Sequence, residues 1–532
     1  MQNFSTIDLC IFIAYILEIA IVGIFIGRNK KNQNRDTTSD YFLASNKLTW
    51  WAVGASLIAA NISAEQIIGM SGSGFKIGLG IASYEWMAAI TLILVAKFIM
   101  PIFLKKGIYT MPQFLEQRYD KRVRTVMAVF WLLVYVFVNL TSILYLGALA
   151  LENIMGIPMM WGIVGLAVFA AAYSIRGGLK SVAWTDILQV ILLIGGGLVT
   201  TYVALNMVSG GNGPFQGLST LFNEAGDKFN MIITRKENPE VWKDLSGIGV
   251  LIGGLWIANI SYWGFNQYII QRGLAAKSIN EAQKGMIFAA FLKLLIPLIV
   301  VIPGIAAFYM HSHGIGNLNI AKPDDAYPAL VSLLPVGVKG LAFAALTAAI
   351  VSSLASMLNS TSTIFTLDIY KPHSKKEVSE KQLVNIGRLT SLVALIIAVL
   401  TARPFLGGLD QAFQFIQEFT GFVSPGVCVI FLLGIFWKKM SANAALWSAI
   451  LTFVLSATFK FLFPGLPFLW RMALVFVVLC LIAIIISYID NSKNDDSKAI
   501  KLSKDIFHTS TAFNVWALVI SAFVAVLYIV FW

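Results

Sequence analysis

Polar side chains in the middle of apolar segments are the part of this sequence that could do chemistry. In the apolar stretch 48–72, residues 61–66 read NISAEQ, where a simple membrane span would carry Leu, Ile and Val. The tetrapeptide ANIS at 60–63 recurs at 258–261, again midway along an apolar segment. A helix loosens in hydrocarbon only where protein or a water-filled cavity receives the freed backbone groups. Paired interruptions of this kind point to the binding site of a secondary transporter.

Ionisable residues support a site at the same depth. Each costs about 2.5–3.5 kcal/mol to insert at the centre of a span and marks function by default. Glu65, Glu85 and Lys293 lie in segments that carry further polar residues, namely Asn61, Gln66, Tyr84, Asn259, Tyr262, Asn266, Gln267 and Gln417. Such a set suits a neutral polyhydroxylated solute, because it offers many hydrogen bonds beside apolar faces. The alternative is that these side chains hold helices together; for the set as a whole we favour a site.

Small residues and hydroxyls form a second group, at 349–356 (AIVSSLAS). Ser352 and Ser353, placed near free carbonyls around Ala59 and Ile62, would make an uncharged cage of oxygens that suits Na⁺. Close helix packing, with each Ser bonded back to its own helix, fits the sequence equally well.

The sequence lacks the residue groupings of a catalytic, metal or nucleic-acid site. We predict that the chain is not an enzyme, because it has no Ser-His-Asp grouping, phosphate-binding Gly loop or metal-ligand spacing. The three cysteines are far apart and indicate neither a disulfide framework nor a metal cluster. His311, His313, Asp324 and Asp325 share one polar loop, where solvated side chains are the better interpretation. The net charge is +12, but a nucleic-acid partner needs a basic face on a soluble domain, and the sequence has none. No obligate protein partner is indicated.

The elements that must position these residues are membrane helices. The chain has 532 residues, of which 58% are hydrophobic and 12% charged, against about 25% charged in soluble domains. At about 20 apolar residues per span, we count fourteen segments, near 7–27, 48–72, 77–104, 123–150, 157–175, 182–208, 248–272, 281–310, 337–368, 384–402, 407–437, 441–463, 468–489 and 511–532. Most of the 39 Lys and Arg residues fall in alternate loops, beginning with the cluster Arg28, Lys30, Lys31 and Arg35. This asymmetry predicts an even number of spans with both termini outside.

Six stretches resemble the sodium/solute symporter family, most closely its bacterial sodium/galactose (sodium/glucose-type) cotransporters. They are WWAVGASLIAANISAEQ, IASYEWM, YSIRGGLKSVAWTD, ANISYWGFNQYIIQR, AAIVSSLASMLNST and FQFIQEFTGFVSPG. The resemblance implies an all-α membrane protein with a LeuT-type inverted repeat of five helices plus five. It divides the chain into an extra N-terminal helix with a basic inside loop (1–47), a first repeat (48–208), an external loop (209–247), a second repeat (248–437) and three C-terminal helices (438–532).

The resemblance also assigns roles by position. Sugar contacts would be Asn61, Gln66, Glu85, Asn259, Lys293 and Gln417. Tyr262 would stack on the sugar and close an inner gate, with Met70, Tyr84 and Phe413 as the outer apolar cover. Sodium would bind the carbonyls of Ala59, Ile62 and Ala349 and the hydroxyls of Ser352 and Ser353, and Asp186 would lie on its exit path.

Three positions depart from the family pattern. Ala88 stands where the galactose transporters carry a sugar-contacting Ser, so the sugar preference stays open. Ser261 replaces a Tyr beside the gate. Ala355-Ser356 stands where relatives with a second sodium carry paired hydroxyls, so we expect one Na⁺ per sugar.

We therefore expect a multi-pass protein of the plasma (inner) membrane, with a hexose such as galactose or glucose, Na⁺ and the lipid bilayer as its partners. The alternatives are a sodium symporter for a non-sugar solute on the same fold or, less favoured, an uncoupled solute or water channel or a sensor.

Overall fold

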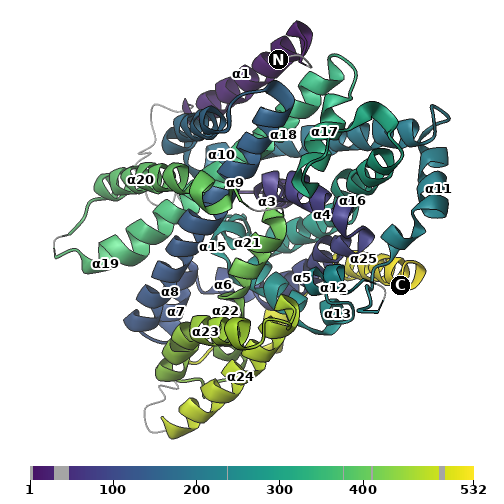
Figure 1. Ribbon diagram of the computed structural model, residues 1–532. Helices are drawn as coiled ribbons and strands as arrows, with labels where there is room; N and C mark the ends of the chain where they lie inside the picture. Colours follow the sequence, from purple (N-terminus) through teal and green to yellow (C-terminus); the bar gives the residue numbers. More distant parts are fainter. Residues whose placement is uncertain (1–3, 29–46, 237, 376, 409–410, 491–497) are drawn as a thin grey trace.

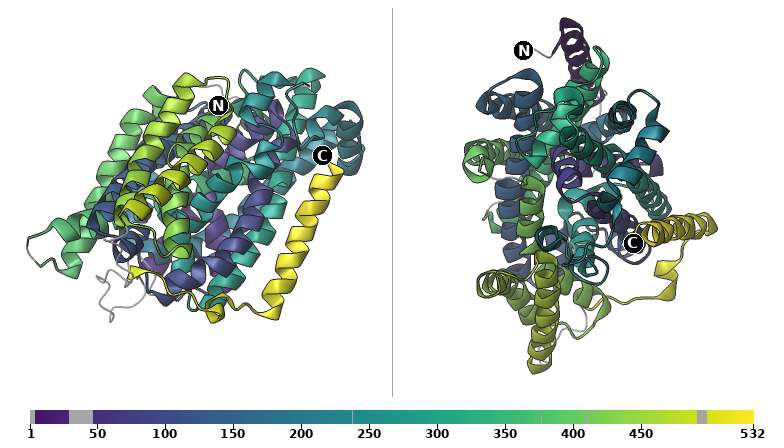
Figure 2. Two further views of the ribbon diagram at one scale, coloured as in Figure 1. Left: turned by 90° about the horizontal axis from the view of Figure 1, so that it is seen from below. Right: turned by 45° about the vertical axis from the view of Figure 1, so that its right-hand side comes forward.

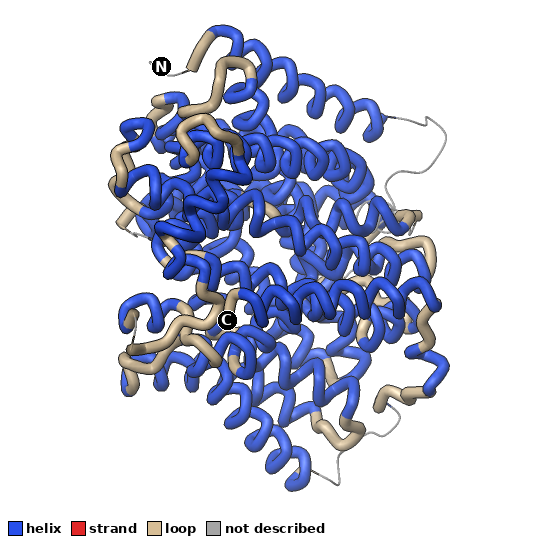
Figure 3. Tube along the Cα trace, turned by 90° about the vertical axis from the view of Figure 1, so that its right-hand side faces the viewer, coloured by secondary structure: helices blue, strands red, loops and turns tan. Residues whose placement is uncertain are grey.

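Helices account for the architecture throughout the described chain (Figure 1). The computed structural model describes residues 4–28, 47–236, 238–375, 377–408, 411–490 and 498–532, without the side chains of 19–20, 22–28 and 173–184. Among these residues the only extended pairing is an isolated bridge between Leu48 and Ala276, and Figure 3 shows no strand. The predicted all-α class is confirmed. The basic cluster 28–35 falls on residues or side chains outside this description. Between the predicted segments 157–175 and 182–208 the backbone continues as one helix, Met159–Val208.

The first half of the chain is built from one peripheral helix and a series of helices interrupted by short π- or 3₁₀-helical turns. These are α1 (Thr6–Arg28), α3 (Trp50–Asn61), η2 (Glu65–Met70), α4 (Ser71–Lys76), η3 (Leu79–Ala82), α5 (Ser83–Phe98), α6 (Met100–Lys105), α7 (Met111–Arg118), α8 (Lys121–Val134), η4 (Tyr135–Leu140), α9 (Thr141–Met155), α10 (Met159–Val208), α11 (Pro214–Glu224), η5 (Gly226–Phe229) and α12 (Pro239–Asp244).

The second half continues in the same way and ends in three long helices. Its elements are α13 (Gly249–Ile252), α14 (Gly254–Ile260), η6 (Ser261–Phe265), α15 (Gln267–Leu274), α16 (Ile279–Ser312), η7 (Ile315–Asn317), η8 (Pro323–Asp325), α17 (Ala326–Ser332), α18 (Val338–Ile364), η9 (Phe365–Tyr370), α19 (Lys371–His373), α20 (Glu380–Leu406), α21 (Ala412–Gly421), α22 (Ser424–Phe436), α23 (Ala442–Leu462), α24 (Phe468–Ile489), η12 (Lys504–Phe507) and α25 (Thr511–Val530).

Length and composition make this a multi-pass membrane bundle. Within the described residues, nine helices are long and apolar enough to cross a membrane, or up to twelve if each of three bent pairs is one span. The apolar window of Val338–His373 is 94% buried, whereas those of α23 and α24 are 28% buried and that of α25 is 22% buried. The core therefore surrounds α18, and α25 stands at the edge (Figure 2).

The first of the bent pairs is the loosened helix that the sequence predicts. Helix α3 ends at Asn61, Ile62 is extended (φ −81°, ψ 101°), and π-helix η2 begins at Glu65. The two halves meet at 64°. The break is possible because the freed carbonyl of Ala60 accepts a hydrogen bond from Ser353 Oγ at 3.2 Å.

The second break, between η6 and α15, differs from the prediction and is separate from the 77° bend between Ile252 and Gly254. Residues 258–261 are helical, and the chain leaves the helix only at Asn266 (φ −81°, ψ 119°), after π-helix η6. Asn266 begins helix α15 as its N-cap, because its side chain accepts a hydrogen bond from Tyr268 N at 3.1 Å. The sequence repeat is thus not a repeat of the break, which forms where a capping side chain is available.

Glycines let two central helices come into contact. A Cβ at Gly54 of α3 would lie 2.6 Å from Phe288 Cδ1 of α16, and one at Gly285 would lie 2.7 Å from Val53 Cβ. Small residues allow this approach between helices in a membrane. The contact holds α3, which carries Asn61, beside α16, which carries Lys293.

The last residues of the described chain fasten α25 to the segment before α12. Met231 N donates to Phe531 O at 2.7 Å, and Ile232 N donates to Trp532 O at 3.2 Å. The Phe222 and Phe531 rings stack at 5.9 Å between centroids.

Candidate functional site

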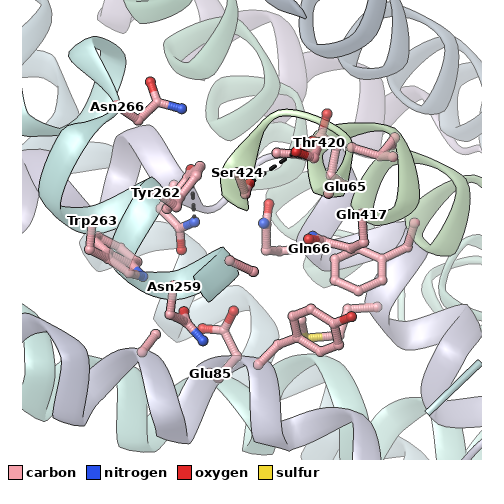
Figure 4. Close-up of a pocket in the computed structure, with 18 of the residues that line it drawn as sticks. Glu65, Gln66, Glu85, Asn259, Tyr262, Trp263, Asn266, Gln417, Thr420 and Ser424 are labelled. Carbon is pink, nitrogen blue, oxygen red and sulfur yellow. Dashed lines mark hydrogen bonds between the residues drawn. The ribbon is translucent and has the colours of Figure 1, made fainter. Parts of the chain in front are cut away.

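A cavity of about 720 Å³, counting the part open to solvent, lies where the two breaks meet. Figure 4 shows polar side chains directed into it from several helices. Its lining residues are Asn61, Glu65, Gln66, Met70, Tyr84, Glu85, Ala88, Asn139, Ala258, Asn259, Tyr262, Trp263, Asn266, Lys293, Phe413, Ile416, Gln417, Thr420, Gly421 and Ser424.

An ion pair lies at one wall of the cavity. Lys293 Nζ of α16 binds Glu85 Oε2 of α5, and the two side chains are only 1% and 4% exposed. Nζ also donates to Asn61 Oδ1 and lies 5.0 Å from the ring centroid of Trp263. Such a buried pair persists because removing either partner would leave the other charge uncompensated.

The same asparagine links the pair to the second broken helix. Asn61 Nδ2 donates to Tyr262 Oη at 3.1 Å, so the amide of Asn61 accepts from Lys293 and donates to Tyr262 at once. Figure 4 shows the Tyr262 bond as a dashed line. The side chain of Asn61 therefore couples a conformational change at one break to the other break.

Gln66 is held so that its amide nitrogen remains available. Its Oε1 accepts from Ser63 N at 3.2 Å and from Ser63 Oγ at 3.1 Å. Nε2 has no hydrogen-bond partner among the described residues. Asn259 is anchored in the opposite sense, because its Nδ2 donates to Leu255 O at 3.1 Å and its oxygen stays free for a ligand.

Apolar groups and aromatic rings cover another side of the cavity. The Tyr84 and Phe413 rings meet edge to face, with centroids 5.4 Å apart, and Met70 is fully buried beside the cavity. Gln417 lines the cavity one turn beyond Phe413 on α21. Ala88 is part of the lining, so the predicted departure from the galactose pattern lies at the cavity itself.

Of the predicted sodium residues on α18, Ser353 contacts the first break directly. Ser353 Oγ contacts the carbonyls of Ala60 at 3.2 Å and Ala59 at 3.5 Å, and Ile62 and Ala349 are buried. Ser352 Oγ donates to Asp186 Oδ1, and Ser56 Oγ donates to Asp186 Oδ2 at 2.6 Å. Asp186 therefore lies in direct contact with one of the predicted ligands.

Gln267 and the polar residues of the loop 311–325 do not line the cavity. Gln267, which the sequence analysis groups with the cavity residues, instead ties α15 to the start of α7: its Oε1 accepts from Met111 N at 2.8 Å and its Nε2 donates to Tyr109 O at 3.2 Å. Within the described residues no cluster of three or more His, Cys, Asp or Glu side chains could hold a metal ion. His311 and His313 bond to backbone carbonyls.

Several lining residues were missed by the sequence analysis. Ile416, Thr420, Gly421 and Ser424 recur with the predicted Phe413 and Gln417 at the spacing of one helical face, and this spacing extends the two predicted residues to a whole helix side. Asn139 had no such signal, because it lies in π-helix η4, where helical periodicity is shifted by one residue.

The family model described as "Sodium:solute symporter family" matches residues 41–452, more than half of the chain. The chain belongs to the sodium:solute symporter family. Within it, a Vibrio parahaemolyticus protein named "Sodium/glucose cotransporter" is 52% identical, with 100% of this chain and 99% of that protein covered.

Two more distant similarities extend the comparison. The Oryctolagus cuniculus protein named "Sodium/myo-inositol cotransporter 2" is 32% identical, covering 84% of this chain and 69% of its own length. A solved structure of a Na⁺-coupled sialic acid symporter, substrate-bound and outward-open, superposes with a TM-score of 0.80 at 27% identity, covering 91% of this chain and 98% of that one.

Proposed function

We propose that the chain is a secondary active transporter that couples inward movement of Na⁺ to uptake of a hexose such as galactose or glucose. The hydrogen-bonded chain Glu85–Lys293–Asn61–Tyr262 carries this proposal, since it borders the polar cavity and joins both broken helices. The relative named as a sodium/glucose cotransporter, 52% identical over the whole chain, supports the same substrate and ion.

The sugar would be bound by Asn61, Gln66, Glu85, Asn259, Lys293 and Gln417. These side chains supply amide donors, amide acceptors and one charged pair, which together match the donors and acceptors of hydroxyl groups. Charge-assisted hydrogen bonds from the Lys293–Glu85 pair would be the strongest of them. The smaller Ala88 leaves one hydroxyl of the sugar without a side-chain partner at that wall.

Gating would use the aromatic residues on the two sides of the sugar. Tyr262 would stack on the ring and close the inner side, held in place by its bond to Asn61. Met70, Tyr84 and Phe413 would form the outer cover. Alternating access would consist of releasing one group while the other stays closed.

Sodium would bind between the first break and α18, at the carbonyls of Ala59, Ile62 and Ala349 and the hydroxyls of Ser352 and Ser353. By neutralising the carbonyls freed at the break, Na⁺ would hold α3 and η2 in the arrangement that presents Asn61 and Gln66 to the sugar. Asp186, which already contacts Ser352, would receive the ion on its way out. We expect one Na⁺ per sugar.

For the membrane topology we propose fourteen spans, comprising the repeats 48–208 and 248–437, the extra helix in 1–47, the external segment 209–247 and three helices in 438–532. A straight helix of 50 residues would be about 75 Å long, more than twice the roughly 30 Å hydrocarbon core. Helix α10 has that many residues, so it would hold two spans. The twelve spans that include the bent pairs already count Thr185–Val208, the second half of α10, so the first half of α10 and α1 bring the number to fourteen. Both termini would lie outside the inner membrane.

Transport into proteoliposomes tests the proposal. We expect galactose or glucose to accumulate when an inward Na⁺ gradient is imposed and not when choline replaces Na⁺. Gln66→Ala should abolish accumulation, because it removes the free amide donor, whereas Gln117→Ala, an exposed change on α7, should leave it unchanged. If Na⁺ drives accumulation of a different solute and of neither hexose, the coupling survives and the sugar assignment is wrong. Equilibration without accumulation would indicate an uncoupled channel.

A further inference from the structure

An aromatic-lined groove lies on the outside of the bundle and shares no lining residue with the sugar cavity. It has a volume of about 1020 Å³, counting its open part, and its lining consists of Trp50, Lys284, Ile287, Phe288, Phe291, Ala512, Phe513 and Trp516. These residues come from the beginnings of three helices, α3, α16 and α25. Figure 2 shows α25 at the edge of the bundle on this side.

The walls of the groove are rings packed edge to face. Trp50 and Phe288 meet with centroids 5.5 Å apart, and Phe291 and Trp516 with centroids 6.3 Å apart. Trp50, Phe291 and Trp516 keep 41%, 40% and 51% of their surface exposed, whereas Phe513 is 2% exposed at the base. A helix surface facing lipid is ordinarily convex, so a hollow between two helices with a wholly apolar base is suited to a single extended hydrocarbon chain.

One charged side chain lies in the lining. Lys284 is half-buried, and within the described part of the chain it has no hydrogen-bond or ion-pair partner. The acid one turn earlier, Glu281, is engaged with the backbone, because its Oε2 accepts from Trp50 N at 2.6 Å. Trp at the ends of spans sits at the level of lipid headgroups, and basic pockets between membrane helices bind anionic headgroups.

We propose that this groove binds one anionic phospholipid, with an acyl chain along Phe288, Phe291 and Trp516 and its phosphate at Lys284. The apolar walls account for the chain, and the unpaired ammonium at the end of the groove accounts for the charge. The lipid would fill the space between α25 and α16 and so connect the peripheral helix to the helix that carries Lys293.

Native mass spectrometry of the full chain tests this, after exchange into micelles containing equal amounts of phosphatidylglycerol and phosphatidylcholine. We expect one phosphatidylglycerol to be retained in preference to phosphatidylcholine. Lys284→Gln should lower that preference about fivefold, the value of one Lys near an anionic headgroup. Lys381→Gln, an exposed change in the first turn of α20, should not alter it. Ala512→Trp, which fills the groove and keeps the charge, should abolish retention of both lipids.

Equal retention of the two phospholipids by the unchanged chain would overturn the anionic assignment. Retention unaffected by Ala512→Trp would overturn the groove as the place of binding. A second copy of the chain in place of lipid, detected as a dimer that Ala512→Trp dissociates, would overturn the lipid. Sodium-driven transport is measured separately on the same variants, so these results do not depend on the sugar assignment.

Discussion

At the residue scale, Lys293 and Glu85 stabilise the fold mainly by neutralising each other's buried charge. Both are buried, and Asn61 is the further polar partner that joins them to Tyr262. The contribution of such a pair to the free energy of unfolding depends on both charges being present, because no interaction offsets the desolvation of a single buried ion.

We predict that Lys293→Met lowers the free energy of unfolding by about 3–5 kcal/mol, and that adding Glu85→Leu restores most of the loss because no lone charge remains. Thermal unfolding in detergent measures both. Lys97→Met, a half-buried lysine in a neighbouring part of the same span as Glu85, serves as the control and should change stability by less than about 0.5 kcal/mol. A double variant no more stable than Lys293→Met would contradict the mutual dependence. Neither variant should transport sugar.

The sodium assignment gives a second residue-scale prediction. Ser353→Ala should raise the Na⁺ concentration needed for half-maximal uptake, with little change in the amount of folded protein, since its hydroxyl contacts the carbonyls of Ala59 and Ala60. Ser362→Ala is the matched control, because that hydroxyl bonds back to Asn359 O in its own helix. An unchanged Na⁺ dependence in Ser353→Ala would remove this residue from the ion site.

At the element scale, the π-helical turns are what bring the cavity together. Among the described elements, η2 carries Glu65, Gln66 and Met70, η4 carries Asn139, and η6 carries Tyr262 and Trp263. A π-turn inserts one residue into a helix and is commonly found at functional sites. Each turn here rotates the following side chains, so that residues from three helices converge on one space.

The break at Asn266 gives a prediction at this scale. Asn266→Ala removes the N-cap of α15 and the bond from Tyr135, and we expect a loss of about 0.5–2 kcal/mol of stability together with weaker sugar binding. Asn266→Asp keeps an acceptor in place and should restore most of the stability. Thermal unfolding and sugar binding are measured on both variants. If Asn266→Asp lost as much stability as Asn266→Ala, the capping role would be contradicted.

The sequence predicts an element well where the residues that determine it lie within one segment. The break after Asn61 was predictable because small and polar residues interrupt an apolar run, and Lys293 and Glu85 stood out because charges are rare there. The repeated ANIS predicts the second break at 258–261, and this prediction is wrong because the cap at Asn266 decides where the helix ends. Asn139 and the contact of Ser352 with Asp186 depend on tertiary packing, which no spacing in one segment reveals.

At the scale of the whole molecule, the proposed sugar and sodium sites would be linked through one broken helix. Ala59, Ala60 and Ile62 lie at its end, and Asn61 and Gln66 flank the same break. A ligand that fixes the break on one side prepares it for the ligand on the other. The coupling free energy between two such sites is necessarily reciprocal.

We therefore predict that saturating galactose or glucose lowers the dissociation constant of Na⁺ by the same factor by which saturating Na⁺ lowers that of the sugar, within roughly 5–150-fold. Calorimetric titrations in detergent, run in both orders, measure the two factors. The Gln66→Ala chain, which should bind no sugar, provides the baseline for Na⁺ alone. Unequal factors, or factors of one, would mean that the two sites are not connected in this way.

The uneven burial of the bundle also fixes how the molecule would respond to a pulling force. Tension applied at Trp532 would first act on the two hydrogen bonds to Met231 and Ile232. Helix α25, buried over only 22% of its apolar window, would then be extracted as one segment at low load. Helix α18, 94% buried, would yield only after its neighbours had been removed, so the extraction forces would rise toward the part of the chain that carries Ser352 and Ser353.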